Sequence, residues 1–451
     1  MKKFWLIMLS LGLIMAFSVS AFAVDVKVSG EYYAAGMYLN KTNVNDSYYS
    51  TKDADRYSNL STAFFYQRMR VKTDFIVSPG LTLVTRIDAM ERIWGGTRNT
   101  ESEPPSVAVD SAGSRSENEN IAIDWAYINY TLPIGTFDVG YMNGGSTGTL
   151  FGNSSKPAGR IKYGYSIEPF TINLAYTKTK EQSFSVVNSS ADWTDADNDL
   201  YGVEGVYKFK DGKAGLNINY YRYAEKRPAS NYKKTYLLFT PYVTAKFGPV
   251  ALQAEFNYAS GKDKEYDNPT KGSDVRLEQM SGWIDATATF APLYVGATFA
   301  YVSGDDPNTK DVKEGGTLTG GNDWNPCLIM FNYYDVANWI GDVQGYDSSI
   351  VTGPMTNAWF FQGRVGVKPK PEIDAMLSVS YAQADKKPTG FTAASYGTEI
   401  DLTGAYKITD NLSYMVGFGY LFTGDYFKGK NAPGADVNDD YLVMNKLTLT
   451  F

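Results

Sequence analysis

Hydrophobic and polar residues alternate in many stretches of this chain. In one stretch, Leu412, Tyr414 and Val416 lie on one side of an extended strand, while Ser413 and Gly417 lie on the other. A period of two residues is that of a β-strand, because successive side chains point to opposite faces. We predict about eighteen strands on this pattern: Val26–Tyr38, Phe64–Val77, Leu81–Trp94, Ile121–Leu132, Thr136–Met142, Arg160–Ile167, Phe170–Lys178, Leu200–Phe209, Ala214–Tyr223, Tyr236–Phe247, Val250–Ala259, Gln279–Phe290, Leu293–Val302, Trp359–Lys368, Ile373–Ala382, Gly397–Ile408, Leu412–Phe422 and Tyr441–Phe451.

Short and long connections alternate between these strands. The short ones carry the residues that favour tight turns: Ser78–Gly80, Pro133–Gly135, Glu168–Pro169, Lys210–Gly212, Gly248–Pro249, Ala291–Pro292, Pro369–Pro371 and Thr409–Asn411. They join the strands into hairpins and leave one strand at each end of the chain. An even number of antiparallel strands with this asymmetry predicts an all-β fold, a transmembrane up-and-down β-barrel.

The long connections then lie on the extracellular side, and the longest is Ser303–Asn357. Loops of this length are usually functional or disordered. Trp324, Phe331 and Trp339 give this one an aromatic content that favours a packed loop. We expect it to fold into the lumen or against a neighbouring subunit.

The two faces of the predicted strands differ in polarity. The stretch 250–259 places Leu252 and Phe256 on one face and Gln253 and Glu255 on the other. An apolar outer face and a polar inner face are typical of a transmembrane barrel. A soluble β-sandwich would show the same period. The chain also holds Tyr 35, Phe 24 and Gly 42 in 451 residues. Aromatic girdles and small lumen-facing residues would explain this composition.

The first residues have the form of a secretory signal peptide. Lys2 and Lys3 precede the apolar run 4–17, and Ala21-Phe22-Ala23 is a small-residue cleavage site. The run is short for a membrane-spanning helix. We predict cleavage near Ala23, a single barrel domain over residues 24–451, and an outer-membrane location.

The last stretch, Tyr441–Phe451, alternates to the end of the chain. In a lipid-spanning barrel the last strand must pair with the first, because an unpaired edge in hydrocarbon is costly. A terminal strand ending in Phe451 also resembles the assembly signal of bacterial outer-membrane barrels. That resemblance implies the barrel assembly machinery as a partner.

The composition excludes several kinds of chemistry. The chain has no histidine and one cysteine, Cys327. Histidine-based catalysis, a disulfide within the chain and a haem attachment motif are therefore excluded, and we predict no enzyme and no cofactor. The net charge of −7 argues against nucleic acid as a partner. The acidic loop segments 195–199 and 304–308 could hold calcium, but solvated loop tips are the commoner case, and no metal is predicted.

Several segments resemble known families of outer-membrane channels. Residues 67–75, 86–88 and 126–130 are similar to strands of porins common in sulfate- and metal-reducing bacteria. Residues 397–402 and 417–427 resemble the C-terminal part of the alginate-export family. The second resemblance implies an eighteen-strand barrel that passes an anionic polymer through an arginine-rich lumen.

Charged residues on the polar faces are the candidate site, because an Arg or Lys facing lipid at mid-depth costs roughly 2–4 kcal/mol. The predicted pore-lining residues are Arg68, Arg70, Lys72, Arg86, Arg92, Arg160, Lys162, Glu255 and Asp285. The cations of the second and third strands would face the acids near the eleventh and twelfth and create a transverse field. The alternative is local pairing, as expected for Arg364 and Lys368 near Glu399 and Asp401.

Three functions follow from this pattern. The first is a porin for passive diffusion of small hydrophilic solutes, with some anion preference. The second is a dedicated channel for one anion or acidic polysaccharide, and the third is a barrel that sheathes an electron-transfer conduit. Expected partners are outer-membrane lipid, lipopolysaccharide and further copies of the chain in a homotrimer, packed through small outward residues such as Ala254 and Ala286.

Overall fold

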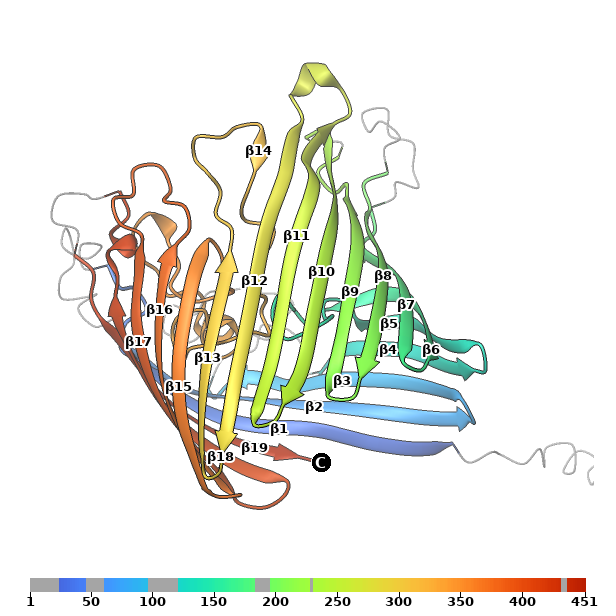
Figure 1. Cartoon of the computed structure of the whole chain (residues 1–451), viewed down its shortest axis with the longest axis horizontal. Coiled ribbons are helices and arrows are strands. Elements are labelled where there is room, and N and C mark those ends of the chain that lie inside the picture. The colour runs from blue at the N-terminus through green and yellow to red at the C-terminus, as the bar shows by residue number, and fades with distance from the viewer. Residues whose placement is uncertain (1–23, 46–60, 96–120, 183–194, 228–229, 431–435) are drawn as a thin grey trace, which may run out of the picture.

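The computed structural model describes residues 24–45, 61–95, 121–182, 195–227, 230–430 and 436–451 (Figure 1). The predicted signal peptide, residues 1–23, and its cleavage site near Ala23 lie outside the described residues. The first strands are β1 (Asp25–Leu39), β2 (Thr62–Ser78), β3 (Leu81–Ile93), β4 (Ile121–Leu132), β5 (Gly135–Asn143), β6 (Pro157–Ile167), β7 (Phe170–Lys180), β8 (Asn198–Phe209) and β9 (Gly212–Tyr223). The others are β10 (Tyr232–Phe247), β11 (Val250–Tyr266), β12 (Val275–Phe290), β13 (Leu293–Val302), β14 (Val312–Lys313), β15 (Ala358–Lys370), β16 (Ile373–Ala384), β17 (Ser395–Lys407), β18 (Leu412–Thr423) and β19 (Asp440–Thr450).

These strands close into one antiparallel barrel. Each long strand pairs with its neighbours along the chain, and β19 pairs with β1. The Gly30 amide donates to the Phe451 carbonyl (2.8 Å), and the Phe451 amide donates to the Gly30 carbonyl (3.0 Å). The two-residue β14 only adds a short parallel pairing to β12. The prediction of an eighteen-strand barrel closed by the terminal strand is confirmed.

Three strands run further than the alternation predicted. β10, β11 and β12 extend beyond their neighbours on the side of the long connections (Figure 1). Most of the additional residues are polar, and Lys262 on β11 lies opposite Arg276 on β12 in the ladder. A hairpin that projects beyond a membrane can continue its backbone ladder in water, where hydrophobic alternation is not required.

The outside of the barrel is apolar. Ile161, Leu174 and Val203, from three adjacent strands, have exposed fractions of 52%, 44% and 50%. Soluble proteins rarely expose apolar surface over such continuous areas. Lipid contact explains it, since hydrocarbon solvates these side chains. None of the helices in the described residues is long and apolar enough to cross a membrane.

The inside of the barrel is partly filled by its own loops. The connection between β13 and β15 enters the lumen, and its Trp339 packs on Tyr66 of β2 with ring centroids 4.5 Å apart. Trp324 of the same loop meets Phe360 of β15, and both are buried. The long loop is therefore packed, and it lies in the lumen. The short helical segments are η2 (Pro269–Lys271), η3 (Tyr333–Ala337), α2 (Asn338–Ile340), η4 (Tyr346–Ser348) and η5 (Asp425–Lys428).

Candidate functional site

The inner face of β1–β4 carries a dense set of charges, which we call the charged wall: Glu31, Arg68, Arg70, Lys72, Asp74, Arg86, Asp88 and Asp124. Strand alternation places the Arg and Lys residues there, because Phe65, Met69 and Val71 take the outer positions of β2. The structure thus brings four predicted pore-lining residues, Arg68, Arg70, Lys72 and Arg86, onto one wall.

The cations of the charged wall are paired with carboxylates. Arg70 Nε donates to Asp88 Oδ1 at 2.6 Å. Arg86 Nη2 lies 2.8 Å from Asp124 Oδ2, and Lys72 Nζ lies 2.9 Å from Asp74 Oδ2. The ladder causes this pairing, because Arg70 stands directly opposite Asp88. The structure therefore shows local pairing of these cations, which is the alternative to a transverse field.

Arg68 faces the inward loop instead of open water. Its Nη2 donates to the Tyr334 hydroxyl, and its guanidinium lies 5.2 Å from the Tyr33 ring centroid and 5.3 Å from that of Tyr334. The loop is tied to the same region by Asp335, which accepts from the Tyr66 hydroxyl (3.2 Å) and pairs with Lys446 (3.1 Å). Arg68 is 6% exposed, so it stabilises the loop's position more than it contacts solute.

Arg92 lies on the outer face, contrary to prediction. A bulge between Gln67 and Met69 shifts the β2–β3 register, so that Gln67 opposes Arg92 and Tyr66 opposes Ile93. Tyr66 and Ile93 are both buried inside, and directly opposed residues share a face. Trp94 follows on the outer face and donates through Nε1 to Gln67 Oε1 (2.9 Å). A bulge adds one residue, and one residue reverses every face beyond it.

The acidic groups opposite the charged wall are also occupied. Glu255 on β11 is 5% exposed and accepts hydrogen bonds from the Thr149 amide (3.1 Å) and hydroxyl (2.9 Å). Asp285 on β12 pairs with Arg364 at 2.8 Å. The predicted pairing of Arg364 and Lys368 with the carboxylates of β17 is therefore wrong. Arg364 binds Asp285, and Lys368 pairs with Asp374 at 3.1 Å. The predicted transverse field needs acidic groups that face the lumen unpaired, and Glu255 and Asp285 are both engaged by other groups.

Glu255 and Glu399 hold two loops inside the barrel. The first loop, residues 144–156, reaches Glu255 through Thr149. Gly148 makes this approach possible, since its φ is +72° and a Cβ there would lie 2.9 Å from Glu255 Oε2. The second loop, residues 303–357, donates the Ile329 amide to Glu399 on β17 at 2.7 Å.

The two loops also bind each other. The Gly152 amide donates to the Gly320 carbonyl at 2.9 Å. The Ser155 hydroxyl donates to Asp323 Oδ2 at 2.8 Å. Together the loops form a partition inside the barrel that is anchored on β11 and on β17.

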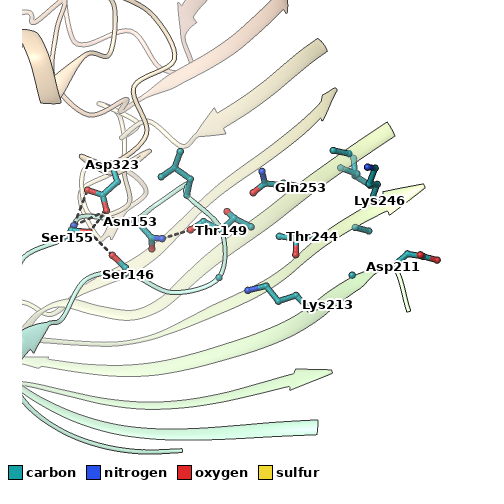
Figure 2. A pocket seen from close by; sticks show the side chains of 16 residues that line it. Ser146, Thr149, Asn153, Ser155, Asp211, Lys213, Thr244, Lys246, Gln253 and Asp323 are labelled. Carbon is teal, nitrogen blue, oxygen red and sulfur yellow. Dashed lines mark hydrogen bonds between the residues drawn. The ribbon is translucent and has the colours of Figure 1, made fainter. Parts of the chain in front are cut away.

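A cavity of about 770 Å³ remains beside this partition (Figure 2). Ser146, Asn153 and Asp323 of the loops line one end, and the short turn at Asp211 lines the other. The strand side, which we call the cavity wall, consists of inward residues of β9–β11: Lys213, Thr244, Lys246 and Gln253. The cavity is thus hydrophilic and reaches the short-turn end of the barrel.

The cavity wall carries cations without acidic partners. Among the described residues, neither Lys213 nor Lys246 forms an ion pair, and Lys213 Nζ lies 5.8 Å from the Tyr242 ring centroid. On β6, Arg160 donates to the Asn143 carbonyl (2.6 Å) and the Thr177 hydroxyl (2.9 Å), both neutral. Lys162, two residues further, stands opposite Asp138 on β5.

Lys213 and Lys246 were not among the pore-lining residues predicted from the sequence, although the alternation could have placed both inside the barrel. Each lies next to a short turn, at the polar end of a strand where a lysine is easily assigned to the membrane surface. The loop residues Ser146, Thr149 and Asp323 gave no usable signal, because their segments have no periodicity.

No family model matches this chain, and no curated protein matches it. Solved structures do match. The outer membrane protein OpdK from Pseudomonas aeruginosa is 10% identical, with 94% of this chain and 99% of that chain covered and a TM-score of 0.51. OprE from Pseudomonas aeruginosa is 12% identical, with 94% and 98% covered and a TM-score of 0.50. The outer membrane channel DcaP of Acinetobacter baumannii is 14% identical, with 96% and 99% covered and a TM-score of 0.46.

The class of protein is defined by the fold. The chain shares the closed β-barrel fold of the outer membrane protein OpdK over 94% of its length. At this identity the likeness concerns the fold alone, so the function has to be argued from the lumen.

Proposed function

We propose that this protein is an outer-membrane porin through which small hydrophilic solutes diffuse passively. The observation that carries the proposal is a closed barrel with an apolar outside and a hydrophilic cavity of about 770 Å³ inside. Hydrocarbon surrounds such an outside, and water fills such an inside. The polar lining offers hydrogen bonds to solutes without the closed, apolar pocket that would hold one ligand tightly.

The partition favours small solutes over polymers. The two inward loops are tied to Glu255 and Glu399 and to each other, so a bulky chain would have to break several buried hydrogen bonds. The same loops fill space that a sheathed cytochrome would need. Passive diffusion is therefore better supported than export of an acidic polysaccharide or an electron-transfer conduit.

A modest anion preference is part of the proposal, and its source is the cavity wall. Lys213 and Lys246 face the cavity with Asp211 and Asp323 at its two ends. Unpaired cations in a confined, partly low-dielectric passage raise the local anion concentration. The paired residues of the charged wall contribute little to this preference.

Conductance of the purified protein in planar bilayers tests the proposal. We expect steady ohmic current, and a reversal potential under a salt gradient that shows weak anion preference. Liposome swelling with sugars of increasing size should give rates that fall steeply with solute size. A folded protein that gives neither current nor swelling would contradict the porin proposal.

We also propose how the barrel contacts its surroundings. The barrel contacts outer-membrane lipid and lipopolysaccharide through its apolar belt. Phe451, which closes the sheet against Gly30, acts as the recognition signal for the barrel assembly machinery. Copies of the chain assemble into a homotrimer.

A further inference from the structure

Cys327 and two carboxylates meet where the long loop touches the barrel wall. Cys327 lies in the loop 303–357, and Glu399 and Asp401 lie on the inner face of β17. Their exposed fractions are 4%, 0% and 3%. One sulfur and two carboxylate oxygens lie within 4.8 Å of one another. Residues far apart in the sequence thus form one buried cluster.

One carboxylate oxygen of the cluster is an unpaired acceptor. Asp401 Oδ1 is buried and has no hydrogen-bond partner among the described residues. Its other oxygen, Oδ2, has a long contact from the Ser378 hydroxyl at 3.4 Å, and the Leu328 amide and the Glu399 side chain also interact with this carboxylate. Glu399 differs, since both its oxygens accept backbone amides, those of Ile329 and Met330, at 2.7 Å. A buried carboxylate with one unpaired oxygen and no cation beside it is costly, so something is needed to offset its charge.

Two other acidic groups of this protein have a cation beside them. Lys178 pairs with Asp197 (2.5 Å) and Asp199 (3.2 Å). On an extracellular connection, the Asn308 amide and the Lys386 ammonium hold the pKa of the Asp306 carboxyl below its ordinary value. Within the described residues, no Lys or Arg pairs with Glu399 or Asp401, and the nearest expected partner, Arg364, binds Asp285.

We propose that Cys327, Glu399 and Asp401 bind one divalent cation of the zinc type. Zinc accepts thiolate sulfur at about 2.3 Å and carboxylate oxygen at about 2.0–2.2 Å. Two ligand atoms of one tetrahedral zinc therefore lie about 3.5 Å apart, and side-chain rotations within the cluster would bring the three atoms to that spacing. The thiolate disfavours calcium and magnesium, which prefer oxygen ligands.

Binding would fasten the long loop to the wall. The Cys327 thiol gives its proton to solvent when the ion binds, and the dication offsets the two buried carboxylates. The loop is already held nearby, because Gln362 Nε2 donates to the Pro326 carbonyl at 2.7 Å. The ion would add a bond between the loop and β17 inside the barrel. This inference does not depend on the proposed transport function.

Cobalt substitution and metal analysis test the site. The protein is refolded in detergent with zinc or cobalt, or with a chelator, and freed of loose metal by gel filtration. We expect one zinc per chain in the wild type. We also expect a cobalt–thiolate charge-transfer band, which can arise only from Cys327 because the chain has no other cysteine.

Three variants make the test specific. Cys327→Asp should keep a metal but lose the charge-transfer band, and Asp401→Asn should lose most of the metal. Asp305→Asn, an acidic residue of the same loop that pairs with Lys313, should bind zinc like the wild type. Heat-modifiability on gels confirms that each variant is folded.

Two results would overturn the proposal. One is folded wild type without bound zinc and without the cobalt band, which would mean that the carboxylates share a proton. The other is zinc retained at one per chain in Asp401→Asn, which would place the ion elsewhere. If a variant fails to fold, the presence or absence of the cobalt–thiolate band in the wild type still tests the site.

Discussion

The barrel carries its inward lysines and arginines in two different settings. On the charged wall, Arg70 and Arg86 lie within 2.8 Å of carboxylates, and Arg68 is covered by the long loop. On the cavity wall, Lys213 and Lys246 face a water-accessible cavity and form no ion pair among the described residues. Both sets point into the barrel, but carboxylates or the long loop offset the charges of the first set, whereas those of the second have no acidic partner among the described residues.

The difference shows that a side chain can point into the lumen without contributing a net charge to it. Alternation decides direction, and the neighbouring strand decides whether the charge is cancelled. A paired, half-buried network stabilises the barrel, because the loss of one partner leaves an uncompensated charge. A cation beside a cavity contributes little to stability and acts on the ions that pass.

The largest expected effect comes from breaking the charged wall. Asp88→Ala leaves Arg70 without its bidentate partner, and we expect the free energy of unfolding to fall by about 3 kcal/mol. Urea unfolding of the protein in detergent or lipid vesicles measures it. The control is Asp211→Ala at the exposed turn beside the cavity, which should stay within about 0.5 kcal/mol of wild type. Equal stability of the two variants would mean that the charged wall is not a stabilising network.

The second prediction concerns selectivity. Lys213→Glu combined with Lys246→Glu replaces the two cations of the cavity wall with acids. The reversal potential under a salt gradient should move clearly toward cation preference, because the sign of the local charge is inverted.

A matched pair of changes on the charged wall controls for general effects. Arg70→Ser combined with Asp88→Ser removes one charge of each sign and leaves the net lumen charge unchanged. It should lower stability but leave the reversal potential close to that of wild type. A larger shift in this control than in the double lysine variant would reverse our assignment of the two walls.

A third, smaller effect is expected from loosening the partition at the cavity. Glu255→Gln weakens the acceptor for the Thr149 amide and hydroxyl, at a cost of about 1.5 kcal/mol for hydrogen bonds to a charged group. The loop 144–156 should then move more, and single-channel records should show more frequent current fluctuations. Gln253 lines the cavity and forms no hydrogen bond with either loop among the described residues, so Gln253→Ala should leave the noise unchanged. Quiet records from Glu255→Gln would show that the loop is held by other contacts.

The smallest effect is expected where the loop covers the charged wall. Tyr334→Phe removes the hydroxyl that accepts from Arg68 but keeps the ring beside the guanidinium, so we expect a loss of about 1 kcal/mol. Thermal unfolding measures it, with Tyr333→Phe as the control on the same segment. Selectivity should not change, since Arg68 does not face open water. A changed reversal potential would show that Arg68 contacts the ion path.

The sequence by itself determined the barrel. Period-two alternation and turn residues are local properties, so they located all eighteen long strands to within a few residues. They also placed Arg68 and Arg70 on the inner face of β2. Closure by the terminal strand followed from the need to pair every edge in lipid. Only the ends of β10–β12, which leave the hydrophobic region, were missed.

The tertiary structure decided everything that depends on register and loop path. A single bulge turned Arg92 to the outer face, and the ladder set Arg70 against Asp88. The paths of the inward loops brought Cys327 to Glu399 and left a cavity at Lys213, and no periodicity encodes such paths. Side-chain direction is fixed within two residues of backbone, whereas the partner of a charge is fixed by how distant segments meet.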